Sequence, residues 1–232
     1  MKFRQIAVLA AVAALGVAAW CFYCHWREHS QDAVILAAAR RYGVEPALVK
    51  AVVWRESWFN PAARGGHGEF GLMQIRAEAA GEWAAAERVK IFQPEQLLDP
   101  VTNTLAGAFY LAKLLKRYPQ SDNPLPYALA DYNAGRGRVL RWNQGAAATN
   151  SAAFLEQMDF PGTKKYIQAV MRRRIHYLPE FVGEKKFQSR EISRSFASSC
   201  WRSCSRCPAV ASRGTKTGSA TRTSQLANGS GI

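Results

Sequence analysis

The sequence predicts an all-α domain, or one nearly so, behind an apolar N-terminal segment. Apolar residues recur at helical spacing in most segments between residues 30 and 178, and prolines and glycines stand where those helices would begin and end. Strand patterns are almost absent, and no internal repeat is visible. With 232 residues, 48% of them hydrophobic and 21% charged, the chain can bury a core of ordinary size.

The helix boundaries follow from turn-forming residues. Gly43 is placed to end the first helix of the domain, and Pro46 suits the first turn of the next one. Asn60-Pro61 breaks that helix, Asp99-Pro100 caps and starts a later one, and Gly135 closes another. In chain order we expect helices over residues 30–41, 46–58, 74–90, 100–118, 124–134, 138–143, 151–158 and 163–178, with a glycine-rich loop or short hairpin over residues 62–70.

The N-terminal segment has the length and composition of a membrane span. Lys2 and Arg4 precede an uncharged stretch from Gln5 to Cys24. As a helix, this stretch would be roughly 30 Å long, enough to cross a bilayer and leave the rest of the chain on the far side. A cleaved signal peptide is the alternative, because Val17-Ala18-Ala19 resembles a small-residue cleavage site.

Aromatic residues favour the uncleaved anchor. Such residues are typical of the point where a helix leaves the membrane. In both cases the domain is exported, and it stays attached to the membrane in the first case and is released in the second. The aromatic residues at this point are Trp20, Phe22, Tyr23 and Trp26.

Three regions are expected: an anchor or signal segment over residues 1–27, a helical domain over 28–186 and a basic tail over 187–232. The tail is rich in Ser, Thr, Arg and Gly, and we expect it to be disordered. More than half of the net charge of +14 lies in residues 185–232. A nucleic acid is not expected as partner, because a recognition-helix pattern, an aromatic platform and a phosphate loop are lacking; an anionic wall polymer suits an exported basic protein better.

No metal or other cofactor is predicted. The cysteines fall outside residues 25–199, so the domain needs no disulfide. Cys200, Cys204 and Cys207 have a spacing that could hold a metal, but a fourth ligand is lacking nearby. The four histidines are scattered along the sequence and form no metal-binding pair.

Glu56 is the main candidate for chemistry. It lies four residues after Val52 and seven after Val49, so it falls on the apolar face of the helix that Pro46 begins. A carboxyl on a buried face is costly unless its pKa rises or it finds partners. A carboxyl that stays protonated near neutral pH is what cleavage of a glycosidic bond needs, because the leaving oxygen must receive a proton.

Two further strings accompany Glu56-Ser57. In Gly71-Leu72-Met73-Gln74 we expect a helix start, with Leu72 or Met73 packed inward and Gln74 offering amide donors and acceptors of the kind that sugars require. In Asp131-Tyr132-Asn133-Ala134-Gly135, Tyr132 falls on an apolar stripe, so its hydroxyl needs a partner such as Glu56. Ser57 can bond a nearby loop or a sugar.

These three strings, in this order, resemble the motifs of the lytic transglycosylases, which cut the glycan strands of bacterial peptidoglycan. The resemblance covers about residues 31–178 and implies a lysozyme-like helical fold with a substrate groove. It also implies a location in the cell envelope, either anchored at the periplasmic face of the inner membrane or exported to the periplasm. It implies that Glu56 is general acid and then base, that Gln74 and Asn133 bind sugar, and that Tyr132 orients Glu56. Ser57, Met73 and Tyr166 are further candidates for binding or orienting the substrate.

The chain departs from the family pattern at three positions. Glu69 and Asp131 stand where many relatives have Ala, and Gly162, just before Tyr166, stands where Glu is common. Glu69 is a possible second acid, and with it the alternative function is hydrolysis by a goose-type-like lysozyme. Asp131 is expected to be structural. A wall-opening enzyme or scaffold of a secretion or conjugation apparatus, with an envelope-spanning machine as partner, is a further alternative.

Overall fold

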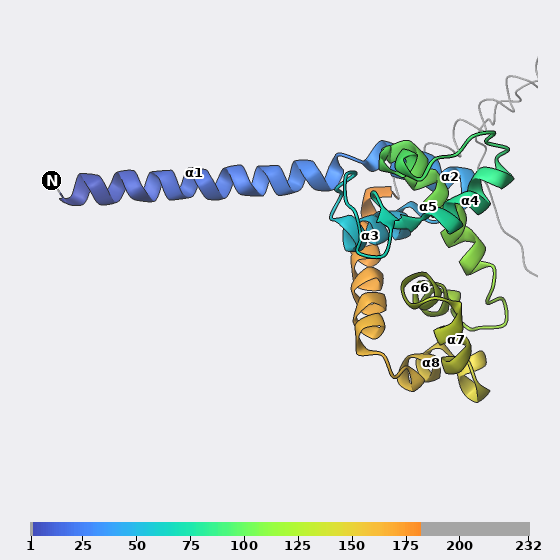
Figure 1. Cartoon of the computed structure of the whole chain (residues 1–232). Helices are drawn as coiled ribbons and strands as arrows, with labels where there is room; N and C mark the ends of the chain where they lie inside the picture. Colours follow the sequence, from blue (N-terminus) through green and yellow to red (C-terminus); the bar gives the residue numbers. More distant parts are fainter. Residues whose placement is uncertain (1, 182–232) are drawn as a thin grey trace, which may run out of the picture. The chain divides into compact units, whose positions relative to one another are not determined.

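The computed structural model describes residues 2–181, and this part of the chain is mostly helical with a single small hairpin, which confirms the all-α prediction (Figure 1). A final helix over residues 161–181, drawn in orange, follows the labelled elements. The elements before it are α1 (Lys2–His29), α2 (Asp32–Tyr42), α3 (Pro46–Ser57), β1 (Glu69–Phe70), β2 (Ile75–Arg76), α4 (Ala77–Ala86), the 3-10 turn η1 (Pro94–Leu98), α5 (Pro100–Leu115), α6 (Pro124–Ala134), α7 (Arg136–Trp142), the 3-10 turn η2 (Gly145–Ala148) and α8 (Ser151–Gln157).

The predicted start and stop residues act as expected. Gly43 ends α2 in the left-handed conformation (φ 66°), and its N–H bonds the carbonyls of the preceding turn. Pro46 lies in the first turn of α3. The Asp99 side chain accepts a hydrogen bond of 2.8 Å from the Thr102 N–H at the start of α5. These contacts satisfy backbone groups that a helix end leaves free.

One predicted helix start is wrong. Gly71-Leu72-Met73-Gln74 forms the turn of a small antiparallel hairpin, in which β1 pairs with β2, and α4 begins only at Ala77. Gly71 (φ 71°) and Gln74 (φ 47°) both have left-handed backbone, which a right-handed helix excludes. The buried Asn103 side chain holds this turn: its Oδ1 accepts from the Met73 N–H (2.7 Å) and its Nδ2 donates to the Phe70 carbonyl (2.7 Å). A long-range contact therefore overrides the local helical spacing.

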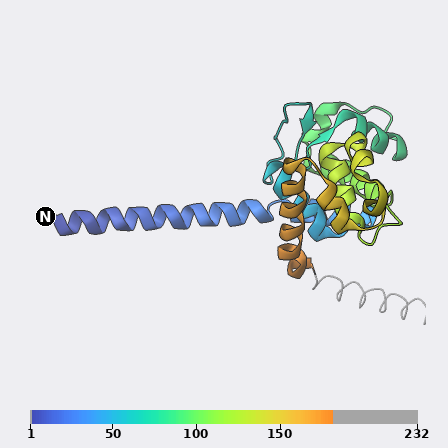
Figure 2. The same cartoon turned by 90° about the horizontal axis from the view of Figure 1, so that it is seen from below.

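The core places α3 against the helix over residues 161–181. Val49, Val52 and Val53 of α3 are fully buried, as the apolar stripe predicted. Both views show α3 beside the orange helix (Figure 1, Figure 2). Arg174 of that helix donates two hydrogen bonds of 2.7 Å to Glu45, the residue just before α3. This bidentate pair fixes the register of the two helices.

Two predicted features remain predictions. The basic tail and its cysteines Cys200, Cys204 and Cys207 lie outside the described residues. The N-terminal segment is described as α1, which is long and apolar enough by composition to cross a membrane. Its apolar side chains are exposed.

We predict that Gly107→Ala lowers the free energy of unfolding by about 1–3 kcal/mol. A Cβ at Gly107 in α5 would lie 2.3 Å from the sulfur and 2.9 Å from the Cβ of buried Met73, so the core would have to shift. Gly81→Ala in α4 is the matched control, because a Cβ there meets nothing within 4 Å. Urea unfolding should find it neutral or stabilised by up to about 1 kcal/mol. Equal losses in the two variants would contradict this packing.

Candidate active site

A cavity of about 670 Å³ lies at the meeting point of the three predicted strings. Its lining residues come from α3, the hairpin and the loop before it, α4, α5, the end of α6 with its following turn, and α7. Five of the predicted site residues line it, namely Glu56, Glu69, Gln74, Tyr132 and Asn133, and Asp131 lines it as well. The remaining lining residues are His67, Ile75, Arg76, Ala79, Tyr110, Ala134, Gly135 and Arg138. Residues up to 82 positions apart in the sequence thus line the same cavity, and the polar ones among them include acids, amides and arginines.

Glu56 lies at the last turn of α3, half-buried, with its carboxyl at the cavity. Burial raises the pKa of this carboxyl to about 7, because a charge is poorly solvated there. The hydrogen bond from Tyr166 and the charge of Arg55 act in the opposite direction, while the negative charge of Glu69 adds to the rise. Glu56 therefore retains its proton up to neutral pH and can still release it.

Tyr166 supplies the hydrogen bond that orients Glu56. Its hydroxyl, on the helix over residues 161–181, donates to Glu56 Oε1 at 2.6 Å. The ring is almost fully buried, and burial, with the nearby charge of Glu56, raises the pKa of Tyr166 well above its usual value. Tyr166 consequently stays a proton-bearing donor, and it fixes the carboxyl from one side.

Tyr132 has a different partner from the one predicted. Its hydroxyl donates to the Met73 carbonyl at 2.7 Å rather than to Glu56. The left-handed turn carries that carbonyl toward α6, which the predicted helix start would not have done. Met73 itself is fully buried. Ser57 donates to the Leu72 carbonyl at 2.8 Å, so it binds the loop, one of its two predicted partners. Tyr132 and Ser57 thus hold the hairpin turn against α6 and α3.

The two predicted amide side chains, Gln74 and Asn133, reach the cavity from the hairpin turn and from the end of α6. The Gln74 amide nitrogen donates to the Gly71 carbonyl at 2.8 Å, which holds the side chain across its own turn. Asn133 is exposed at the end of α6, and its Oδ1 accepts from the Thr163 hydroxyl at 2.8 Å. The amide nitrogen of Asn133 is thereby turned away from Thr163. Both side chains are held in place before any ligand arrives.

Glu69, the possible second acid, is engaged by a neighbouring cation. Arg76 donates to Glu69 Oε1 at 2.7 and 3.0 Å, and the His67 backbone N–H donates to Oε2 at 2.9 Å. Partial burial acts to raise the pKa of Glu69, but the Arg76 and His67 hydrogen bonds outweigh it, so the pKa lies below its ordinary value. The pKa values of Glu56 and Glu69 are thus shifted in opposite directions, which favours the neutral form of Glu56 and the charged form of Glu69.

Sequence reasoning missed the arginines of the cavity and gave Asp131 its structural role. Asp131 is buried, and its Oδ2 accepts from Arg117 (2.6 Å) and Tyr118 (2.7 Å). This network anchors the end of α6 that presents Tyr132 and Asn133. Arg76 and Arg138 line the cavity from the hairpin and from α7. In the sequence, only the overall positive charge of the chain pointed to arginines at the site.

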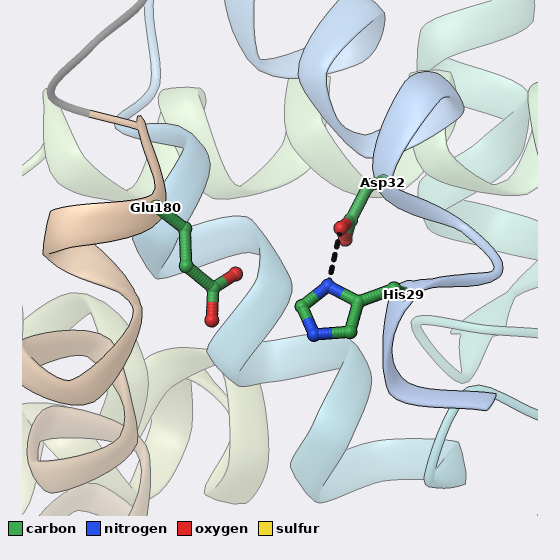
Figure 3. Close-up of side chains that lie close together, drawn as sticks. All are labelled: His29, Asp32 and Glu180. Atoms are coloured by element: carbon green, nitrogen blue, oxygen red, sulfur yellow. Dashed lines mark hydrogen bonds and ion pairs between the residues drawn. The ribbon is translucent and has the colours of Figure 1, made fainter. Parts of the chain in front are cut away.

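A second cluster of chemically capable side chains lies away from this cavity. His29, Asp32 and Glu180 place one potential metal-ligand atom each within 4.8 Å of one another (Figure 3). The ammonium of buried Lys50 already lies 2.7 Å from both acids and 3.2 Å from His29 Nδ1. The Lys50 ammonium therefore already occupies the cluster as its cation, and the cluster is an ion-pair network that joins α1, α2, α3 and the last helix.

Comparison with known proteins identifies the family of this fold and site. A family model described as "Transglycosylase SLT domain" matches residues 33–155, more than half of the chain. The chain belongs to the SLT transglycosylase family. The match includes the three strings and ends before Tyr166.

Several curated relatives of this SLT domain are named lytic murein transglycosylases. The soluble lytic murein transglycosylase of Salmonella typhimurium is 33% identical over 62% of this chain and 22% of its own length. Membrane-bound lytic murein transglycosylase C of Yersinia enterocolitica is 37% identical over 50% of this chain and 34% of its own length. The chain thus spans well under half the length of these curated relatives.

Solved structures agree with the SLT fold. Lytic transglycosylase Slt of Pseudomonas aeruginosa, solved as an inactive mutant, matches with a TM-score of 0.58 and 28% identity over 64% of this chain and 24% of that one. The 70 kDa soluble lytic transglycosylase of Escherichia coli also has a TM-score of 0.58, with 26% identity over 71% of this chain and 30% of that one. These matches confirm the lysozyme-like helical fold expected from sequence.

We predict that Glu56→Gln gains stability relative to the wild type as pH rises from about 5 to about 8. Since the folded state raises the pKa of Glu56 from 4.5 to about 7, the stability contributed by its proton is complete below about pH 4.5 and is lost as pH rises through about 7. The amide escapes this loss, which amounts to at most about 3 kcal/mol.

Glu69→Gln is the matched control for that measurement, with the opposite sign. Folding lowers the pKa of Glu69, so the charged Glu69 carboxylate stabilises the folded state. This stability is present above the pKa of the unfolded state and is lost as pH falls through the pKa of the folded state. Urea unfolding should therefore find Glu69→Gln less stable than the wild type at about pH 8. A pH-independent difference between Glu56→Gln and the wild type would contradict the raised pKa.

Proposed function

We propose that this chain is a peptidoglycan lytic transglycosylase, a non-hydrolytic carbohydrate lyase. It cleaves the β-1,4 bond between N-acetylmuramic acid and N-acetylglucosamine and leaves 1,6-anhydromuramic ends. The observation that carries the proposal is the Glu56 carboxyl, protonated to about neutral pH inside a cavity lined by amides and arginines. Membership of the SLT family and the names of its relatives support the same reaction.

One carboxyl can perform both proton transfers of this reaction. Glu56 gives its proton to the glycosidic oxygen, and the bond from that oxygen to the anomeric carbon breaks. The carboxylate then takes the proton of the muramoyl 6-hydroxyl, whose oxygen bonds to the anomeric carbon and closes the anhydro ring. The N-acetyl group of the sugar stabilises the positive charge between these events. Tyr166 holds Glu56 in place for both steps.

Most glycosidases that hydrolyse this kind of bond use a second carboxylate as nucleophile or as water-activating base. Glu69 already accepts hydrogen bonds from Arg76 and from the His67 N–H, so most of its acceptor capacity is in use. Its charge also favours the protonated form of Glu56, which is the form the first step requires. Glu69 therefore assists Glu56 electrostatically, and intramolecular attack by the sugar is the route these contacts favour.

Peptidoglycan strands are the proposed partner, and α1 is the proposed membrane anchor at the periplasmic face. The length and apolar composition of α1 support anchoring, as does the name of the membrane-bound Yersinia relative. We propose residues 28–186 as the catalytic domain. The lining arginines Arg76 and Arg138 suit the carboxylates of wall peptides. No observation favours an envelope-spanning machine as a partner over general wall turnover.

Product analysis tests the reaction. Purified peptidoglycan digested with the full chain should yield muropeptides whose ends are lighter than reducing ends by one water, as read by mass spectrometry. Glu56→Gln should lower the rate by at least about 100-fold, since it removes the transferable proton. Glu69→Gln should still give anhydro ends. Reducing ends from the wild type would reject the transglycosylase in favour of a lysozyme.

Tyr166→Phe should slow the reaction and move the alkaline limb of its pH–rate profile to higher pH. The Tyr166 hydrogen bond lowers the pKa of Glu56, so its loss lets that pKa rise further and keeps the acid protonated longer. Tyr132→Phe is the control, because the Tyr132 hydroxyl bonds the Met73 carbonyl. Its alkaline limb should stay in place. The same shift of the alkaline limb in both variants, or no shift in Tyr166→Phe, would contradict the role of Tyr166 as the hydrogen-bond donor to Glu56.

A further inference from the structure

A series of aromatic rings links the apolar helix α1 to the end of the helix that carries Glu56. The rings of Trp20 and Tyr23 lie 5.9 Å apart, centroid to centroid, and those of Tyr23 and Trp26 lie 6.3 Å apart. The Tyr23 ring also lies 6.4 Å from that of Trp58, the residue directly after α3. We call these four residues the aromatic surface.

Arg27 fixes this junction with several contacts. Its Nε donates to the Trp58 carbonyl at 2.8 Å, and its guanidinium carbon lies 4.5 Å from the centre of the Trp58 ring. Its Nη1 donates to the Tyr23 hydroxyl at 2.7 Å. Next along α1, Glu28 pairs with Arg173 of the last helix at 2.7 Å. The last turn of α1 is thereby tied to the two helices that meet at Glu56.

Trp58 is an unusual residue for its position. Its backbone is left-handed (φ 50°, ψ 47°), a conformation that favours glycine and costs a tryptophan on the order of 1 kcal/mol. Its side chain is not used to fill the core, since 37% of the residue is exposed. Trp20 and Trp26 are 62% and 59% exposed. Burial within the domain therefore does not account for a large ring held at this site.

We propose that the aromatic surface, Trp58 included, lies in the interfacial layer of the bilayer that α1 crosses. Tryptophan and tyrosine prefer that layer because their rings are apolar and their N–H and O–H groups reach water. Arg27 beside the rings suits lipid phosphates. The inference rests on the proposed anchoring by α1 and extends it: the catalytic domain itself contacts the membrane, through the end of its catalytic helix.

The contact has a consequence for substrate choice. Glu56 precedes Trp58 by two residues, about 3 Å of helix rise, so a Trp58 seated at the bilayer keeps the acid close to the membrane surface. The substrate of the anchored enzyme is then glycan that lies next to the membrane, and strands further out in the wall are beyond its reach. A release of the domain from the membrane would remove this restriction.

Tryptophan quenching by brominated lipids tests the location of Trp58. The full chain is reconstituted into phosphatidylcholine–phosphatidylglycerol vesicles with brominated acyl chains, in a Trp20→Phe/Trp26→Phe background that leaves α1 apolar. We expect fluorescence to be quenched relative to unbrominated vesicles. Adding Trp58→Phe should remove most of that quenching, while adding Trp83→Phe should keep it, because Trp83 is buried in the domain. Thermal unfolding checks that each variant is folded.

Two outcomes would overturn the proposal. The first is equal quenching with and without Trp58, together with quenching of Trp58 by aqueous acrylamide in the presence of vesicles. This result would show that Trp58 lies in water, and the aromatic surface would then suit a protein partner instead. Failure of the full chain to float with vesicles would reject the anchoring on which the inference rests. Anhydro-product formation by the same preparations is scored separately, so a failed membrane contact stays distinguishable from a failed enzymatic assignment.

Discussion

The site depends on keeping one carboxyl partly out of water at the junction of two helices. Glu56 comes from α3 and Tyr166 from the helix over residues 161–181, 110 residues later, and one hydrogen bond of 2.6 Å joins them. Burial raises the pKa of the carboxyl and the Tyr166 bond moderates the rise. A more exposed Glu56 would ionise at neutral pH and lose its acid role; one without its hydrogen bond would lose its orientation.

Ion pairs far from the cavity maintain that junction. Arg174 pairs with Glu45 before α3, and fully buried Lys50 within α3 pairs with Glu180 near the end of the last helix. A buried lysine adds little net stability, because removing its charge from water costs about as much as its partners return. It does specify one alignment, since any slip of the two helices would leave a buried charge unpaired. The register of the acid and its donor follows from this constraint.

Much of this architecture could be predicted from local sequence, and the rest could not, for physical reasons. Gly43, Pro46 and Asp99 act within one helical turn of their own position, so the helix ends could be read directly. The hairpin turn of Gly71–Gln74 is held by Asn103, 29 or more residues away, and helical spacing misled the prediction there. Periodicity placed Glu56 on the buried face. It could not choose between Tyr132 and Tyr166 as donor, because that depends on how two distant helices pack.

The most direct test of the account is the titration of Glu56 itself. Carbon-13 NMR of side-chain-labelled glutamate, with Glu56→Gln to assign the resonance, would follow its ionisation in the folded protein. We predict a midpoint at about pH 7, and a further rise of that midpoint in Tyr166→Phe. A midpoint near the ordinary value of 4.5 would mean that Glu56 is charged at neutral pH. The single-acid mechanism would then lose its proton donor.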